Sequence, residues 1–205
     1  MKNWFCILSI GFLVVVFFKT ESFAHPHVFI NQKIKIVFDA KGVAGFRIQW
    51  EFDDMFTTMI AGDYDINKNQ LLEKNEVTTI KEKAFSYLAN SNYFTFIKID
   101  NVPFNVKFVQ HFSATIINKK LIYDFFIPCH VSASFNTKRI IVATYDPTYY
   151  SAISFAEHHG AVLDEVKGDI ERFETEVMIQ EDKSTKIYFD MICPTALFLE
   201  FRLAK

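Results

Sequence analysis

The stretch that decides the fold is KIKIVFDAKGVAGFRIQWEFDDMF, residues 33–56. Every second residue is large and apolar from Ile34 to Phe38, and again from Phe46 to Phe52. A period of two is typical of a strand that buries one face. The Asp-Ala-Lys-Gly segment at residues 39–42 has the composition of a turn. The stretch therefore predicts an antiparallel β-hairpin with one face in solvent.

The period changes directly after this hairpin. Asp53 or Asp54 is suited to cap a short helix, whose apolar positions are Met55, Phe56, Met59 and Ile60. A polar stretch over residues 62–75 follows. A second helix is then predicted from the spacing of Val77, Ile80, Ala84 and Leu88, and it ends at residues 90–92. We expect a helix-loop-helix insert over about residues 53–90.

Short strands with turn residues between them fill the rest of the chain. They are predicted over residues 93–99, 104–109, 114–117, 121–127, 139–145, 173–180, 186–191 and 196–203. The expected fold class is α+β, a mostly antiparallel β-sheet with an inserted EF-hand-like helix-loop-helix. Residues 25–205 form one β-rich domain. Half of the 205 residues are hydrophobic, which excludes a disordered chain.

Residues 1–24 have the three-part layout of a secretory signal peptide. Lys2 supplies the positive start, residues 4–18 are almost entirely apolar, and Ser22-Phe23-Ala24 offers small residues at a cleavage site. The apolar run is shorter than the roughly 20 residues of a transmembrane helix. We expect export, cleavage before His25 and a mature chain that does not span the membrane; a retained anchor is the alternative.

In an exported protein, cysteines meet an oxidising compartment and can form disulfides that are rare in the cytoplasm. Cys129 and Cys193 remain in the predicted mature chain, and a prolyl residue flanks each of them. An even pair in an oxidising compartment favours one disulfide. Two buried free thiols are the alternative, because unpaired cysteine packs as a small hydrophobic residue.

Residues 65–76 align with the twelve-residue calcium loop of an EF-hand. The side-chain ligands of this alignment are Asp65, Asn67, Asn69, Glu73 and Glu76, and Leu71 supplies its backbone carbonyl. Gln70 departs from the pattern, because the loop normally has glycine there for its positive φ. A polar connector that keeps the shape and holds no ion is the alternative.

The start of the predicted mature chain, His25-Pro26-His27, is a second candidate metal site. A free α-amine and two imidazoles suit copper, nickel, cobalt or zinc. Pro26 has no N–H, so binding through a deprotonated amide at that position is excluded. A polar terminus that binds nothing is the alternative.

Other functional classes find little support in the sequence. The 22 basic and 24 acidic residues give a net charge of −2, whereas a nucleic-acid binder carries a basic face. No nucleophile elbow, phosphate loop, HExxH or CxxC occurs, so we do not expect an enzyme.

Three segments of the chain carry a resemblance to a known family. They are the His-Pro-His-Val-Phe-Ile start at residues 25–30, Phe46 to Phe56 with its Trp-Glu-Phe-Asp run, and Tyr-Asp-Pro-Thr-Tyr-Tyr at residues 145–150. With the loop at 65–76, they resemble a family of periplasmic bacterial proteins of unknown function. Its members are described as the periplasmic component of an uncharacterised ABC-type transport system and are associated with nickel/cobalt-type efflux permeases. The resemblance implies a periplasmic role in transition-metal handling.

Three functions remain open on the sequence. The first is a periplasmic metal-binding accessory protein, in which His25 and His27 capture a transition metal for a membrane permease or ABC transporter and the 65–76 loop holds structural calcium. The second is a periplasmic protein-interaction module without a transition metal. The third is a copper oxidoreductase built on the terminal histidine, which requires an open coordination position and redox activity.

Overall fold

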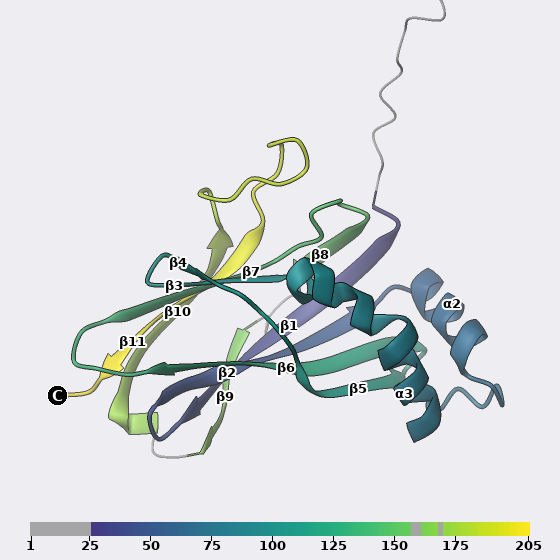
Figure 1. The fold of residues 1–205 in the computed structure, drawn as a ribbon, viewed down its shortest axis with the longest axis horizontal. Helices are drawn as coiled ribbons and strands as arrows, with labels where there is room; N and C mark the ends of the chain where they lie inside the picture. The colour runs from purple at the N-terminus through teal and green to yellow at the C-terminus, as the bar shows by residue number, and fades with distance from the viewer. Residues whose placement is uncertain (1–25, 157–160, 168–169) are drawn as a thin grey trace, which may run out of the picture.

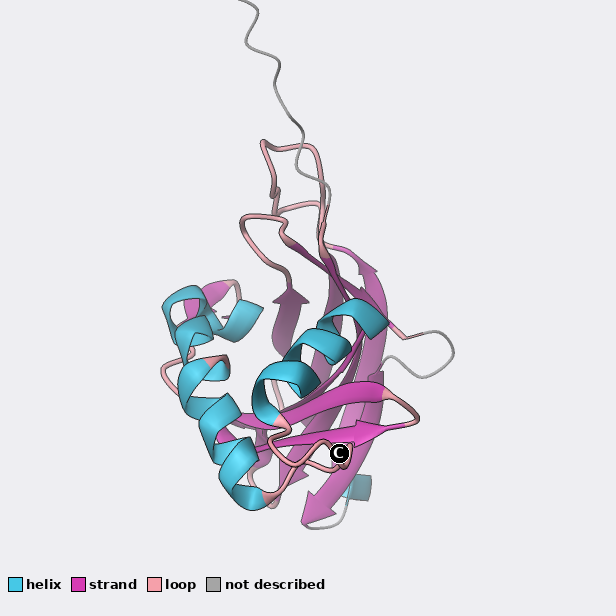
Figure 2. Cartoon of the chain, turned by 90° about the vertical axis from the view of Figure 1, so that its right-hand side faces the viewer, coloured by secondary structure: helices cyan, strands magenta, loops and turns pink. Residues whose placement is uncertain are grey.

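The computed structural model describes residues 26–156, 161–167 and 170–205. The predicted signal peptide at 1–24 and His25 lie outside the described residues. Two β-sheets enclose the main core, and the helices gather at one end of them (Figure 1). Figure 2 looks onto that end and shows the helices in front of the strands.

The first sheet contains the predicted hairpin, which is confirmed. β1 (Val28–Asp39) pairs antiparallel with β2 (Gly42–Phe52), with Ile34 opposite Ile48. Asp39 Oδ1 accepts hydrogen bonds from the backbone N–H groups of Lys41 (2.7 Å) and Gly42 (3.1 Å) and so shapes the turn. Gly42 is needed there because a Cβ would stand 2.3 Å from the Val131 carbonyl oxygen.

The remaining strands of this sheet lie on both sides of the hairpin. β6 (Lys120–Ser132) pairs with β2, and β5 (Gln110–Ile117) pairs with β6, both antiparallel. β8 (Ser151–Phe155) and β9 (Ala161–Lys167) both run parallel to β1. The order is β5-β6-β2-β1-β8, with β9 also on β1.

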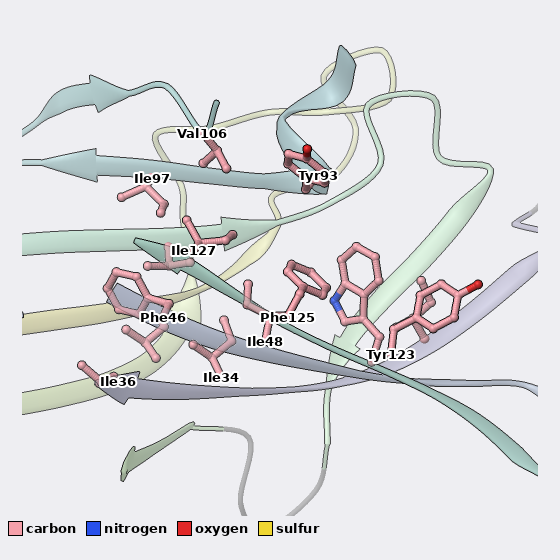
Figure 3. Close-up of a cluster of buried hydrophobic side chains, with 14 of the residues drawn as sticks. Ile34, Ile36, Phe46, Ile48, Tyr93, Ile97, Val106, Tyr123, Phe125 and Ile127 are labelled. Atoms are coloured by element: carbon pink, nitrogen blue, oxygen red, sulfur yellow. The ribbon is translucent and has the colours of Figure 1, made fainter. Parts of the chain in front are cut away.

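The second sheet is antiparallel throughout, in the order β10-β11-β7-β3-β4. Its strands are β3 (Thr95–Ile99), β4 (Val102–Phe104), β7 (Lys138–Thr144), β10 (Phe173–Glu181) and β11 (Thr195–Leu203). Figure 3 shows the core between the two sheets, where Ile34, Phe46 and Ile48 lie on one side and Ile97 on the other. The alternation in the sequence places these side chains inward.

The helices follow β2, as expected, but the second one is shorter. α2 (Asp54–Tyr64) is capped by Asp53, and α3 is Lys74–Lys83. The prediction of one helix to residue 88 is wrong, because Ala84 leaves helical geometry (φ −122°, ψ −56°) and the chain continues as the 3₁₀ segment η1 (Phe85–Phe94). A further 3₁₀ turn, η2, is Ile170–Arg172.

The fold is mixed α/β with mostly antiparallel sheets, as the sequence predicts. The strand expected over 186–191 is wrong: the segment holds only an isolated bridge between Ile187 and Ile192, and Tyr188, Phe189 and Asp190 have positive φ. β8 and β9 were not expected. Within the described part of the chain, no helix is long and apolar enough to cross a membrane.

Candidate functional site

The segment between α2 and α3 folds around Asp65, which is only 5 % exposed. Its Oδ1 accepts a hydrogen bond from the backbone N–H of Asn69 (3.2 Å), and its Oδ2 accepts one from Gln70 (2.8 Å). Gln70 adopts the left-handed backbone, with φ 63°. A short-chain carboxylate at the start of the segment thus fixes the turn that follows.

Two asparagine side chains of this segment contact Glu73. The amides of Asn67 (3.1 Å) and Asn69 (2.7 Å) both donate to Glu73 Oε1. Glu73 Oε2 is buried and accepts no hydrogen bond from the described residues. Contact with the side chain of Glu76 and the hydrogen bonds from Asn69 and Asn67 lower the pKa of Glu73 to about 2, so this carboxylate stays ionised.

Glu76 joins the 65–76 segment to the start of α3 through hydrogen bonds to backbone N–H groups. It is 3 % exposed; its Oε1 accepts from the Ile66 N–H (2.8 Å) and its Oε2 from the Glu73 N–H (2.9 Å). Leu71 has an exposed side chain, and its N–H donates to Asn69 Oδ1 (2.7 Å). The residues aligned with a calcium loop therefore lie in one hydrogen-bonded cluster, with Glu76 engaged by backbone N–H groups.

His27 lies at the start of β1 and is exposed. Its backbone N–H donates to the Tyr150 carbonyl oxygen (2.8 Å), and its ring centroid is 5.0 Å from that of Tyr150. Its imidazole forms no hydrogen bond or ion pair with another described residue. His27 is thus fixed at its backbone and ring while its ring nitrogens remain available for a ligand.

Two carboxylates position this end of β1. Asp53 Oδ2 accepts from the Phe29 N–H (2.7 Å), while Oδ1 accepts from the Phe56 N–H (2.8 Å) as the cap of α2. Buried Asp146 accepts from the backbone N–H and the hydroxyl of Thr148 and from the Ser151 N–H. Neither the bond from the Phe29 N–H to Asp53 nor the bonds from Thr148 and Ser151 to Asp146 were predicted from the sequence, although Asp146 before a proline in the 145–150 segment is a turn signal.

The two cysteines do not form the expected disulfide in this structure; both are free thiols. Cys129 lies in β6 of the first sheet, and Cys193 precedes β11 of the second. Burial raises the pKa of the Cys129 thiol to about 12. This agrees with the alternative of free thiols, although both cysteines are partly exposed rather than fully buried.

Metal-ligand side chains are sparse elsewhere. Among residues 26–156, 161–167 and 170–205, no three His, Cys, Asp or Glu side chains are grouped so that they alone hold a metal ion. The 65–76 segment relies on asparagine and backbone oxygens as well, and the terminal site includes His25, which lies outside the described residues.

The chain is similar to proteins without known function. A protein of Haemophilus influenzae described as "Uncharacterized protein" is 26% identical over 151 residues, which cover 70% of this chain and 69% of the relative. An "Uncharacterized 15.5 kDa protein in trpE 3'region" of Spirochaeta aurantia is 25% identical over 137 residues, covering 67% of this chain and 94% of the relative. Residues 10–186 match the family described as "Protein of unknown function (DUF1007)". The chain therefore belongs to the DUF1007 family.

Proposed function

We propose that the protein is an exported periplasmic metal-binding accessory protein that presents or buffers a transition metal for a membrane transporter. The observation that carries the proposal is His27, which is exposed, is held in place by Tyr150 and has no hydrogen bond or ion pair from its ring nitrogens to another described residue. A histidine with no structural task at a surface is available as a ligand. The sequence resemblance supports a metal permease or ABC transporter as the partner.

The terminal site uses three nitrogen donors. Cleavage after residue 24 gives His25 a free α-amine, two positions before His27 in the chain. The α-amine and the two imidazoles suit nickel, cobalt, zinc or copper. The hydrogen bond from His27 N–H to Tyr150 occupies one backbone amide, and Pro26 has none. Binding therefore proceeds through the amine and the imidazoles, and it leaves coordination positions open for donors of the transporter.

The test compares three forms of the protein in their metal content and affinity. The form that begins at His25 is expected to retain a transition metal through desalting, and His27→Ala is expected to lose it. One added glycine before His25 displaces the α-amine and is expected to weaken binding strongly. His130→Ala, which removes an exposed histidine from β6, serves as the matched control. Equal metal content in all forms would refute the terminal site.

The 65–76 segment is proposed to hold a structural calcium ion in an EF-hand-like arrangement. Asp65, Asn67, Asn69, Glu73 and Glu76 offer side-chain oxygens, and Leu71 a backbone carbonyl, at the spacing of a calcium loop. Gln70 takes the positive φ that the loop requires. The Glu73 side chain also forms a capping box with Glu76 at the start of α3, and its ionised carboxylate supplies negative charge at a ligand position of the loop.

Calorimetric titration with Ca²⁺ tests this second site. The wild-type protein is expected to bind weakly, in the range of about 10⁻⁴–10⁻³ M known for extracellular modules. Glu73→Gln is expected to abolish the heat of binding, while Glu82→Gln, an exposed change on α3, is expected to leave it unchanged. Equal binding by both variants would show that the ion lies elsewhere.

The second candidate function is a periplasmic interaction module without a transition metal. Phe189 and Met191, on the loop between β10 and β11 (the yellow-green loop at the top of Figure 1), are 85 % and 58 % exposed. Exposed apolar side chains on a projecting loop favour contact with a partner protein. Absence of transition metal from the form that begins at His25 would favour the function of an interaction module.

A further inference from the structure

A cavity of about 540 Å³ lies between the helices and the first sheet. β1, β2 and β6 form its floor, α2 and η1 form its sides, and residues 146–151 close one edge. Its volume falls in the range of about 300–1,000 Å³ that small-molecule sites occupy. The wall is largely aromatic, with Trp50, Phe52, Phe56, Phe85, Phe94 and Tyr123 among its residues.

The tethers described above build this cavity from distant parts of the chain. Val28 at the start of β1, Trp50 to Phe56, and Asp146 to Ser151 all contribute to its wall. Asp53 joins β1 to α2, and the Tyr150 carbonyl oxygen accepts from the N–H groups of His27 and Val28. Because these bonds fix the segments to one another, the cavity is a preformed part of the fold.

Two of the residues that line the cavity carry a buried polar atom without a hydrogen-bond partner among the described residues. The Tyr123 hydroxyl and the Trp50 indole N–H form no hydrogen bond with any described residue, and the two residues are 3 % and 1 % exposed. Figure 3 shows the Tyr123 hydroxyl pointing away from the core residue Phe125. A buried polar group without a partner destabilises the free protein, because its lost hydrogen bond to water is not replaced. Such unpartnered groups are expected in a binding site, where a bound ligand supplies the missing hydrogen bond.

The charged residues that line the cavity restrict the charge of the ligand that it can bind. Asp63 and Asp146 line the cavity, and no lysine, arginine or histidine is among the described residues that do so. Both oxygens of Asp146 already accept hydrogen bonds from Thr148 and Ser151. A carboxylate, sulfonate or phosphate ligand would find no positive partner here, whereas aromatic faces accept neutral rings and cations.

We propose that this cavity binds a small aromatic organic molecule, neutral or cationic, whose polar group forms a hydrogen bond with the Tyr123 hydroxyl. The space of about 540 Å³ corresponds to on the order of 18 water molecules at about 30 Å³ each, which is enough for a molecule with two aromatic rings. The proposed binding requires no metal ion, so its test is run in the presence of a chelator.

The test uses N-phenyl-1-naphthylamine, an uncharged probe with two aromatic groups and one N–H donor. The chain has two tryptophans, Trp4 and Trp50, so Trp4→Phe in the full chain leaves Trp50 as the sole tryptophan whether or not the leader is removed. Binding in the cavity is expected to quench Trp50 fluorescence and to transfer its excitation to the probe. The anionic probe 8-anilino-1-naphthalenesulfonate is expected to bind at least tenfold more weakly.

Three variants locate the bound probe. Tyr123→Phe removes only a hydroxyl without partner, so it should fold normally and weaken binding about five- to tenfold, the effect of one hydrogen bond. Tyr87→Phe removes the hydroxyl of an exposed tyrosine outside the cavity and should change nothing. Ala84→Phe fills the cavity and should prevent energy transfer, with circular dichroism as the check on folding.

Some results would overturn the proposal. They are no energy transfer from Trp50 to the neutral probe, equal affinity of the Tyr123→Phe and Tyr87→Phe proteins, and tighter binding of the anionic probe. Since Tyr123→Phe preserves the ring and its packing, it remains decisive even where the Ala84→Phe protein is unfolded.

Discussion

Replacing Asp53 by alanine is expected to detach β1 from α2. The carboxylate accepts from the Phe29 N–H at 2.7 Å and from the Phe56 N–H at 2.8 Å. Loss of a helix cap costs about 1 kcal/mol. The bond to Phe29 is charge-assisted but exposed to solvent, so we assign it about 1 kcal/mol, the value of a typical hydrogen bond and less than the roughly 1.5–3 kcal/mol of bonds to charged groups. The free energy of unfolding should therefore fall by about 2 kcal/mol, which is roughly a thirtyfold change in the unfolding equilibrium.

The neighbouring Asp54 provides the matched control. Its side chain is 83% exposed and forms an ion pair with Lys120 at 2.8 Å, an interaction worth less than about 1 kcal/mol. Urea denaturation of the two alanine variants measures the difference, and hydrogen exchange at the Phe29 amide should accelerate only in Asp53→Ala. A loss in Asp54→Ala as large as that in Asp53→Ala would refute the reasoning.

Three further predictions concern the 65–76 segment and Cys129. Gln70→Gly should raise the free energy of unfolding by about 0.5 kcal/mol, because relief of the left-handed backbone exceeds the entropic cost of glycine. Gln180→Gly in β10, where φ is not positive, should lower the free energy of unfolding. If urea denaturation shows that both variants change this free energy in the same direction, the explanation is excluded. The pKa of Glu73 is lowered to about 2 in the fold, so its ionised form stabilises the protein above pH 4.5, and this stabilisation is lost as the pH falls from 4.5 to 2. The difference in the free energy of unfolding between the wild-type protein and Glu73→Gln should therefore decrease from pH 6 to pH 3. A difference that stays constant would contradict the lowered pKa. Because burial raises the pKa of Cys129 to about 12, iodoacetamide at pH 8 should label Cys129 only after unfolding, and mass spectrometry that finds it labelled in the native protein would show that this thiol is accessible.

Local patterns were sufficient to predict the strands that pair with near neighbours. The hairpin of β1 and β2 follows from alternation alone, since its turn lies between the two strands. β8 and β9 were missed because both are short and pair in parallel with β1 from more than a hundred residues away. The strand predicted over 186–191 has the right composition, but three successive residues there have positive φ, which single-residue preferences do not reveal.

The candidate site was predictable to the extent that its residues are close in sequence. Asp65, Asn67, Asn69 and Glu73 share one segment, and the structure brings their side chains or backbone groups together. The sequence left open whether Asp53 or Asp54 caps α2. In the structure Asp53 is the cap, because its side chain accepts from the Phe56 N–H, and the same carboxylate also accepts from the Phe29 N–H. The role of Tyr150 beside His27, and that of Tyr123 in the cavity, depend on tertiary contacts that no local pattern records.

The parallel pairing of β1 has a consequence for the order of folding. β1 is among the first described segments to be synthesised, yet Ser154, which donates to Asn31 Oδ1 at 3.4 Å, is 123 residues further along the chain. Until β8 and β9 reach β1, one of its edges has no strand to pair with, and such an edge invites pairing with other chains. Closing so long a loop is slow. The newly made chain therefore passes through a period in which its risk of aggregation is concentrated on its first strand.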